Sequence, residues 1–212
     1  MITSRPVKAV ILAAGRSTRM GEQKLLMPFK GMPMVDFVIK TVLSCGFDGT
    51  SVVVSQETLN CLTPVEGADY IVNPDPDRGQ DSSFHCALSA LLVDASFAVF
   101  LADKPAVTAE QIMELRRRFE LLLHAEKPRK SALVPLKRVA PGDNAPGHPA
   151  FYAYLWRERF LSSGESGRAT LFRHEEDVKW AESDAYENFF LDVDTPEDYR
   201  KINNYERREK NL

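Results

Sequence analysis

The sequence predicts an α/β fold in three layers, with a mostly parallel central sheet and helices on both faces. Short apolar runs of strand length alternate with stretches whose apolar residues recur every three or four positions, which is the pattern of strand–helix–strand units. The apolar runs are nearly continuous, as expected for parallel strands buried on both faces. A chain of 212 residues can bury such a core without disulfides or a structural metal ion.

The first strand, the first helix and the second strand follow one another near the N-terminus. Residues 7–12 form a short apolar run that ends at a glycine turn. Residues 34–43 carry apolar side chains on one helical face, and Gly46 ends this helix. Residues 51–54 form the next strand. The apolar helix positions are Val35, Val38, Ile39 and Val42.

Two further strand–helix units follow. Residues 70–72 predict a short strand before the turn-rich residues 73–76, and residues 97–101 predict the most hydrophobic strand of the chain. A stripe of apolar residues indicates a helix after each strand, and Thr108 with Gln111 forms a capping box before the second helix. The two stripes are Phe84, Leu88, Leu91, Leu92 and Ala95, and Ile112, Leu115, Phe119 and Leu122.

The periodic pattern weakens in the last third of the chain. The segments predicted there are a strand at residues 132–135, a loop rich in proline and glycine at 140–149, and short helices at 154–161 and 167–174. Thr195 and Pro196 predict the cap and first turn of a final helix. Because the sequence contains neither an internal repeat nor a long linker, we expect residues 1–212 to form a single domain.

Composition and charge exclude several classes of protein. The formal net charge is −3, whereas proteins that coat nucleic acids or membrane surfaces carry a strong basic excess. Three cysteines without a CxxC pair fit a reduced chain better than a secreted disulfide scaffold. The apolar stretch at residues 9–14 is too short for a signal peptide or a membrane span. We therefore expect a cytoplasmic protein with neither a nucleic-acid nor a membrane partner.

The turn after the first strand has the composition of a phosphate-binding loop. Small residues at positions 13–15 let backbone N–H groups approach an anion, and Arg16, Arg19 and Lys24 add up to three cations. The spacing matches neither GxxxxGKS/T nor GxGxxG, which disfavours a P-loop ATPase and an ordinary dinucleotide fold. The alternative is a glycine turn followed by a solvated basic loop, which three cations after a buried strand disfavour.

Acidic residues stand at two places where a metal ion could bind. Asp103 follows the most hydrophobic strand, and ligands of open α/β sheets bind at the carboxyl ends of the strands. A carboxylate there can hold Mg²⁺ together with substrate phosphates. Asp192 and Asp194 form a second acidic pair before the last helix. The alternatives are an ordinary turn aspartate for Asp103 and helix capping for the pair.

Five segments occur in the order seen in one enzyme family. They are LAAGRSTRMGEQKLL at residues 12–26, LADKP at 101–105, GHPAFY at 147–152, GESGR at 164–168 and DVDTPEDY at 192–199. In these segments the chain resembles the molybdenum cofactor cytidylyltransferases, which are MobA-like nucleotidyltransferases with a Rossmann-like fold. The last three segments point to the cytidylyl branch rather than to sugar-nucleotide enzymes.

The resemblance implies a role for each matching residue. Arg19 and Lys24 hold the triphosphate and are catalytic together with Asp103, which also binds Mg²⁺. Asp194 is the second metal-facing position, with Asp192 as its close alternative. The nucleotide-lining residues are Leu12, Ala13, Ala14, Gly15 and Ser82, and the acceptor-binding residues are Gly147, His148, Pro149, Gly167 and Arg168.

Some positions depart from the family pattern. Where the family reads GMSSSL, this chain has Gln80 and Asp81 in place of an apolar residue and a hydroxyl. Lys104 replaces the glutamine of the common DQP, and GESGR replaces the commoner GDxGR. Asp81 is either a third acid near the metal or the cap of a helix that begins at Ser82, and we favour the cap.

The resemblance implies transfer of CMP from CTP to the terminal phosphate of molybdopterin, with Mg²⁺ and with release of pyrophosphate. The guanylyl-transferring relatives read LAGG, and this chain has Ala14 at the second glycine position. By this resemblance CTP is favoured over GTP, because the larger residue narrows the purine side of the pocket. The partners are then CTP, a phosphorylated pterin and a potential molybdoenzyme client. Two alternatives stay open: cytidylyl or uridylyl transfer to a sugar or alditol phosphate, and a chaperone that carries molybdenum cofactor to an oxidoreductase.

Overall fold

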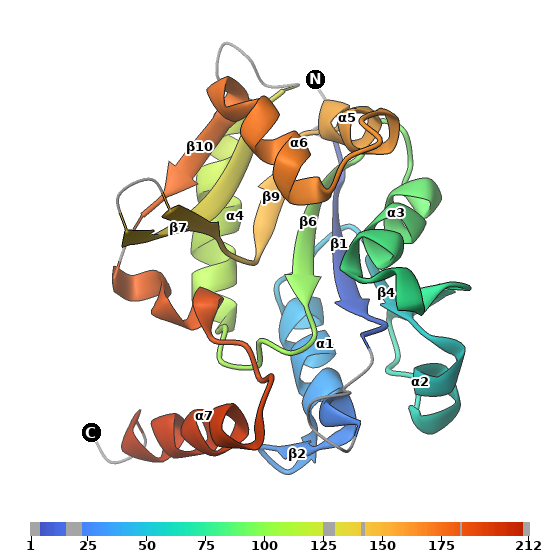
Figure 1. Cartoon of the computed structure of the whole chain (residues 1–212), viewed down its shortest axis with the longest axis vertical. Coiled ribbons are helices and arrows are strands. Elements are labelled where there is room, and N and C mark those ends of the chain that lie inside the picture. The colour runs from blue at the N-terminus through green and yellow to red at the C-terminus, as the bar shows by residue number, and fades with distance from the viewer. Residues whose placement is uncertain (1–4, 16–22, 125–129, 141–142, 183, 210–212) are drawn as a thin grey trace.

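The computed structural model describes residues 5–15, 23–124, 130–140, 143–182 and 184–209 of the chain. An eight-stranded sheet runs through its centre in the order β5-β4-β1-β6-β9-β7-β10, with β8 paired to β7 (Figure 1). Its strands are β1 (Val7–Ala13), β4 (Thr50–Val54), β5 (Ala68–Val72), β6 (Ser96–Leu101), β7 (Ala132–Ala140), β8 (Asp143–Pro146), β9 (Ala150–Tyr152) and β10 (Val178–Ala181).

Most of this sheet is parallel, so the α/β fold expected from the sequence is confirmed. Strand β1 lies between β4 and β6 and is parallel to both, and the pairs β4–β5 and β7–β10 are also parallel. Strand β9 is antiparallel to its two neighbours, β6 and β7. Because β1 and β6 are parallel neighbours, the turns that follow them leave the sheet at the same edge.

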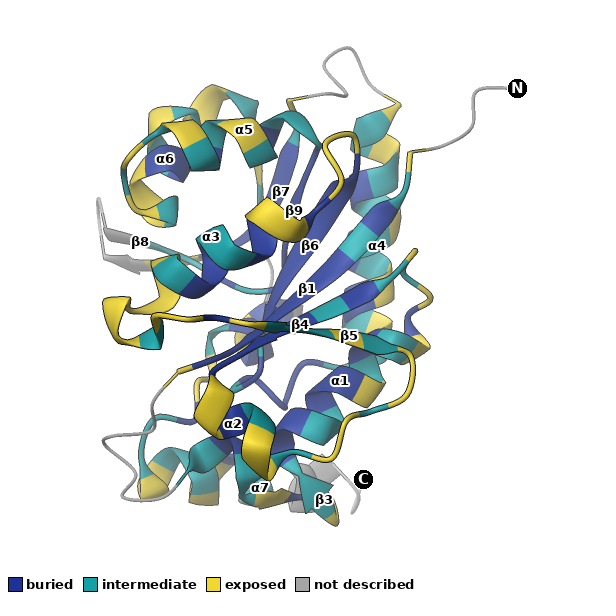
Figure 2. Cartoon of the chain, turned by 90° about the vertical axis from the view of Figure 1, so that its right-hand side faces the viewer, coloured by how far each residue is buried: buried dark blue, intermediate teal, exposed yellow. Residues whose placement is uncertain are grey.

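Helices cover both faces of the sheet, as Figure 2 shows. One face carries α1 (Met34–Ser44) and α4 (Ala109–Leu123), and the other carries α3 (Gln80–Ala90), α5 (Leu155–Ser162) and α6 (Gly167–Arg173). Helix α2 (Gln56–Cys61) follows β4, and α7 (Pro196–Glu209) is the last helix. Within the described ranges, none of the helices combines the length and the apolar character needed to cross a membrane.

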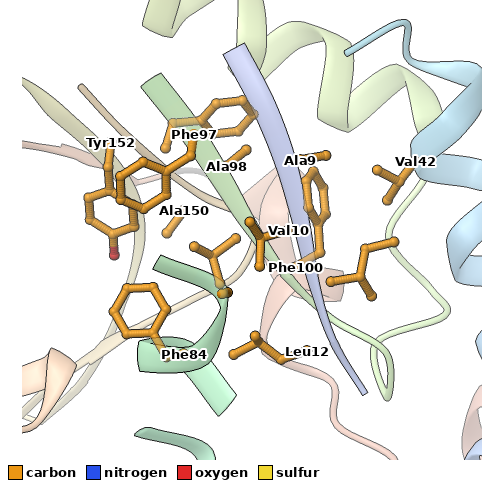
Figure 3. Packing of buried hydrophobic residues seen from close by; sticks show 14 of the residues in the cluster. Ala9, Val10, Leu12, Val42, Phe84, Phe97, Ala98, Phe100, Ala150 and Tyr152 are labelled. Carbon is orange, nitrogen blue, oxygen red and sulfur yellow. The ribbon is translucent and has the colours of Figure 1, made fainter. Parts of the chain in front are cut away.

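Aromatic side chains pack against both faces of the central strands. Phe97 and Phe100 are three positions apart on β6 and therefore point to opposite faces. The ring of Phe97 lies 5.3 Å from that of Tyr152, and the ring of Phe100 lies 5.7 Å from that of Phe47. Phe84 of α3 approaches the first of these groups (Figure 3). Burial of each such side chain contributes about 1.5–3 kcal/mol to the stability of the fold. This packing fixes the central strands relative to the helices on both faces.

A second apolar cluster fixes the segment before α7 close to the N-terminal half of the chain. Phe29 belongs to a short hairpin of β2 (Pro28–Phe29) and β3 (Met32–Pro33), and it is buried with Met34, Val193 and Ile202. Helix α7 begins as the sequence predicts, with the hydroxyl of Thr195 accepting a hydrogen bond from the N–H of Asp198 at 3.1 Å. Burial of Val193 in this cluster therefore fixes the position of the segment that leads into α7.

Several short elements do not show in the sequence pattern, and two predictions were wrong. Strands β9 and β10 and helix α2 have too few residues to display a period. The loop predicted at residues 140–149 contains strand β8, because pairing with β7 needs no apolar run. The helix predicted to carry Leu92 and Ala95 ends at Ala90, and the Leu92 side chain is 58% exposed.

Candidate active site

The turns after β1 and β6 line a cavity of about 190 Å³, which we call the edge cavity. The N–H of Ala102 donates to the carbonyl of Leu12 at 3.1 Å, and this bond holds the two turns together. The cavity wall contains Leu12, Ala13, Ala14, Gly15, Lys24, Leu25, Pro76, Gly79, Gln80, Ser83, Leu101 and Asp103. The structure thus brings most of the residues predicted to line a nucleotide into one wall. Arg16 and Arg19 fall within residues 16–22, which lie outside the described residues.

Lys24 joins two acids from distant parts of the chain. Its Nζ lies 2.7 Å from Oδ2 of Asp103 and 2.8 Å from Oδ1 of Asp194. Burial by itself lowers the pKa of Lys24. The charges and hydrogen bonds of the two carboxylates together raise this pKa by more than burial lowers it, so the net shift is upward. Lys24 is therefore a firmly charged ammonium group. Its side chain is 12% exposed, and a group entering the edge cavity can reach it.

Asp192 has a different partner. It forms an ion pair with Nζ of Lys104, whose side chain is only 6% exposed. Between the two acids, the N–H of Val193 donates to the backbone carbonyl of Asp103 at 3.1 Å. The segment of residues 192–194 is thus attached to the turn after β6 by a backbone hydrogen bond and by the ion pair of Asp192, and to Lys24 by the ion pair of Asp194.

The two carboxylates that Lys24 joins could also hold a divalent metal ion. Among the described residues, no group of three or more His, Cys, Asp or Glu side chains forms a complete metal site. Oδ2 of Asp103 and Oδ1 of Asp194 contact the same nitrogen at 2.7 and 2.8 Å, so a small movement of either carboxylate brings both within reach of one ion with bonds of about 2.1 Å. Mg²⁺ commonly takes one or two carboxylates and completes its shell with water and substrate phosphates. This pair of oxygen donors fits that requirement.

A larger cavity of about 400 Å³ lies between β6, β9 and the helices α3, α5 and α6, and we call it the main cavity. Four of the residues predicted to bind an acceptor line it, namely Gly147, His148, Gly167 and Arg168. The fifth, Pro149, is buried and lies instead against a small hollow beside His148 and Lys104. The aromatic side chains of Phe84, Tyr152 and Phe160 supply apolar surface, with the ring of Phe160 inclined by 71° to that of Phe84 and by 90° to that of Tyr152.

The two cavities adjoin each other. Leu12, Gly79 and Gln80 belong to the walls of both. A molecule in the main cavity therefore lies directly beside one in the edge cavity. This is the arrangement required when a group passes from one bound molecule to another.

His148 is a neutral side chain in this structure. Its Nδ1 lies 3.3 Å from the carbonyl oxygen of Val99. Burial, followed by the positive charge of Lys104, lowers the pKa of His148 to about 4, against smaller opposing effects of Val99 and Asp103. A side chain at the neighbouring Gly147 would have to displace the ring of Phe190, because a Cβ atom there would lie 2.6 Å from Cε1 of that ring.

Two predictions about the start of α3 need correction. The hydroxyl of Ser82 points away from the edge cavity and donates to the carbonyl of Asp75 at 2.7 Å, so the serine in the cavity wall is Ser83. Asp81 does not cap its own helix, which begins one residue earlier at Gln80. Its Oδ1 accepts a hydrogen bond from the N–H of Gly167 at 3.0 Å and so ties α3 to α6.

Sequence reasoning also missed several residues of the cavity walls. Gly79 and Gln80 lie where the two cavities meet, and Ser83 lies deeper. Ser83 accepts a hydrogen bond from Nδ2 of buried Asn73 at 3.0 Å, which orients it. The sequence did contain a signal for Ser83: it stands four positions before the apolar Ala87 and so lies on the same, buried face of the helix.

Comparison with known families and curated proteins gives a consistent result. The family model of the MobA-like NTP transferase domain matches residues 9–178. The bifunctional protein GlmU of Shouchella clausii is 36% identical over 113 residues, which are 50% of this chain and 24% of GlmU. The purine catabolism protein PucB of Bacillus subtilis is 29% identical over 119 residues, which are 50% of this chain and 57% of PucB. Each match spans less than two thirds of the curated relative.

Solved structures share the fold over nearly the whole chain. Rv0371c of Mycobacterium tuberculosis H37Rv has a TM-score of 0.72 at 22% identity, covering 95% of this chain and 100% of that one. Molybdopterin-guanine dinucleotide biosynthesis protein A of Archaeoglobus fulgidus has a TM-score of 0.68 at 21% identity, covering 95% and 99%. A CMP:2-keto-3-deoxy-manno-octonic acid synthetase, solved with CTP, has a TM-score of 0.75 at 14% identity, covering 96% and 99%.

Proposed function

We propose that this chain, which belongs to the MobA-like NTP transferase family, transfers CMP from CTP to the terminal phosphate of molybdopterin and releases pyrophosphate. The observation that carries this proposal is the contact between the two cavities. The edge cavity contains the cation Lys24 and the acid Asp103, whereas aromatic side chains and four of the five predicted acceptor residues line the main cavity. Their common wall is where the two substrates would meet.

The reaction needs no nucleophile from the protein. An oxygen of the acceptor phosphate forms the new bond to the α-phosphorus of CTP, and the bond from that phosphorus to the oxygen bridging to the β-phosphate breaks. The electron pair leaves with pyrophosphate. The protein contributes by aligning the two substrates and by offsetting negative charge. Lys24 would contact the triphosphate, and the backbone N–H groups of residues 13–15 would lie along it.

Asp103 and Asp194 would hold Mg²⁺, and Lys24 would move from the carboxylates to the phosphates when the nucleotide enters. A bound Mg²⁺ offsets negative charge on the phosphate oxygens as the α–β bond breaks. A structure of similar fold, Rv0371c of Mycobacterium tuberculosis, was solved as a complex with manganese, which supports a divalent ion here. Each well-placed positive group or donor contributes about 3 kcal/mol to transition-state stabilisation.

The main cavity favours a planar acceptor. Phe84, Tyr152 and Phe160 offer apolar surfaces on which a flat ring system can lie. Arg168 at the cavity wall supplies a positive charge for an anionic part of the acceptor. A sugar or alditol phosphate would use the polar groups but leave most of the aromatic surface without a partner. A molybdoenzyme that takes over the product would be the partner protein.

Pyrophosphate release tests the proposal. The purified full chain is incubated with Mg²⁺ and CTP, GTP or UTP, each with molybdopterin, with a sugar or alditol phosphate, or with no acceptor. The proposal predicts release with CTP and molybdopterin above all other combinations. Faster release with a sugar or alditol phosphate would show that this compound, and not molybdopterin, is the acceptor. Tight pterin binding without release from any nucleotide would favour the carrier function instead.

A further inference from the structure

The turn after β6 carries a lysine whose place in the site differs from that of Lys24. Lys104 is 6% exposed and forms an ion pair with Asp192, while Lys24 contacts Asp194 and Asp103. The lysine is held by its backbone as well, since its N–H donates to the carbonyl of Leu101 at 3.3 Å. Lys104 lines neither of the two large cavities, so a substrate bound there would not contact it.

The segment that carries the two acids has two conceivable registers against the turn after β6, which differ in the acid placed beside Asp103. Side chains two positions apart on an extended segment point to the same side, so Asp192 and Asp194 both face the turn after β6 while buried Val193 points into the second apolar cluster. A shift of two residues would exchange Asp194 for Asp192 beside Asp103. Two features oppose this shift: the backbone hydrogen bond from Val193 to Asp103 and the burial of the Val193 side chain in the second apolar cluster.

The ion pair of Lys104 adds a third contribution, and it is the one that acts on the acids themselves. A buried ammonium group is costly unless a carboxylate stays beside it, so Lys104 retains Asp192 and leaves Asp194 as the acid that meets Asp103. We propose that Lys104 is a positioning residue: by holding Asp192 away from the site, it sets Asp194 against Asp103 and Lys24. This inference rests on the proposed function, because it presumes that Asp103 and Asp194 act together on a divalent ion.

Four forms of the full chain test this role: the parent, Lys104→Met, Asp192→Asn and the double variant. Methionine keeps the apolar stem of the lysine and removes its charge. Mn²⁺ alone is the probe, and its free concentration is followed by electron paramagnetic resonance. Turnover of CTP is measured alongside, with kcat and KM separated, and thermal unfolding reports whether each variant folds.

We expect each single variant to weaken Mn²⁺ binding and to lower kcat by about 10- to 100-fold, the range for residues that orient a metal ligand. In Lys104→Met the released Asp192 competes for the place of Asp194, and in Asp192→Asn the unpaired Lys104 competes for the acids. The KM for the acceptor should change far less than kcat. The double variant removes both competitors, so it should recover most of the loss in Mn²⁺ affinity.

If a folded double variant does not recover Mn²⁺ affinity, the proposal is overturned. That result would mean that the function needs Lys104 itself, and not merely the absence of a competing Asp192. Unchanged Mn²⁺ affinity in both single variants would overturn it as well. If a single variant does not fold, the comparison of the double variant with the parent still decides. Lys201→Met is the matched control, since it breaks an exposed ion pair with Glu197 on α7 and should leave Mn²⁺ binding unchanged.

Asp103→Asn separates this inference from the proposed function. If the parent binds Mn²⁺ and Asp103→Asn does not, the metal assignment stands, and the variants of Lys104 and Asp192 test the positioning role by itself. If the parent and Asp103→Asn bind Mn²⁺ equally, the metal assignment in the proposed function is wrong and the positioning role falls with it.

Discussion

Lys24 and Asp194 form an ion pair of 2.8 Å although 170 positions separate them in the chain. The pair brings the C-terminal acid to Lys24, a residue of the edge-cavity wall. Because Lys24 contacts Asp103 as well, a single ammonium group links three segments. Substitutions at these residues are the most direct tests of the site.

Lys24→Ala should weaken CTP binding and turnover together while the chain stays folded. The side chain lies at the wall of the edge cavity, outside the main apolar core, so its removal costs little packing. We expect a loss of about 100-fold or more in kcat/KM, the effect of removing one strong electrostatic contact. Nucleotide binding by calorimetry and initial rates measure it. Lys179→Ala, an exposed residue on β10, is the control, and losses within twofold of that control would contradict the assignment.

Replacing either Asp103 or Asp194 by alanine should lower turnover by about 100-fold or more. Two neighbouring carboxylates repel each other, but Lys24 lies between them in this structure. We therefore expect no gain in the melting temperature from either change. Rates at saturating Mg²⁺ and thermal unfolding measure the two effects, with Asp69→Ala at an exposed site as the control. Full activity of the Asp194→Ala variant would show that Asp194 is not part of the active site.

Ala14→Gly should relax the choice of nucleotide. Ala14 is 2% exposed and belongs to the wall of the edge cavity, where its methyl group would take space from a base bound there. We expect the preference for CTP over GTP to fall by about 1–2 kcal/mol, the scale of a small change in pocket volume. Competition between the two nucleotides gives the ratio of kcat/KM. A parent enzyme that prefers GTP would refute the prediction.

Gly147→Ala should destabilise the chain, because the new Cβ atom would lie 2.6 Å from the ring of Phe190. We expect a loss of about 1–3 kcal/mol in the free energy of unfolding, as for other overpacked sites. Denaturant unfolding measures it. A second substitution, Phe190→Leu, should recover part of the loss by removing the ring. Equal stability of the parent and Gly147→Ala would show that the ring moves aside freely.

His148 should make the free energy of unfolding depend on pH. Its pKa is about 4 in the folded chain and about 6.5 in an unfolded one, so the unfolded state takes up the proton first as the pH falls. The stabilising contribution is complete above pH 6.5 and is lost between pH 6.5 and 4, by at most about 1.4 kcal/mol per pH unit. Denaturant unfolding across this range should show a shallower dependence for His148→Gln. The same slope in both proteins would contradict the lowered pKa.

The sequence by itself determined the elements whose signal is local. The apolar runs of β1 and β6 and the face of α1 are visible because burial repeats at the period of each element. The positions of Asp103 at a strand end and of Thr195 at a helix start follow from the same local rules. The short strands β9 and β10 give no such signal, because three or four residues are too few to display a period.

Only the tertiary structure decided which of two similar neighbours faces the site. Ser83 lines the edge cavity rather than Ser82, since successive helix positions point about 100° apart. Asp194 meets Lys24 and Asp103 while Asp192 meets Lys104, although both acids lie on the same side of one segment. The direction of a side chain depends on the path of the whole backbone and on partners that are distant in sequence. A motif can therefore indicate the chemistry of a site but leaves the choice between adjacent residues to the fold.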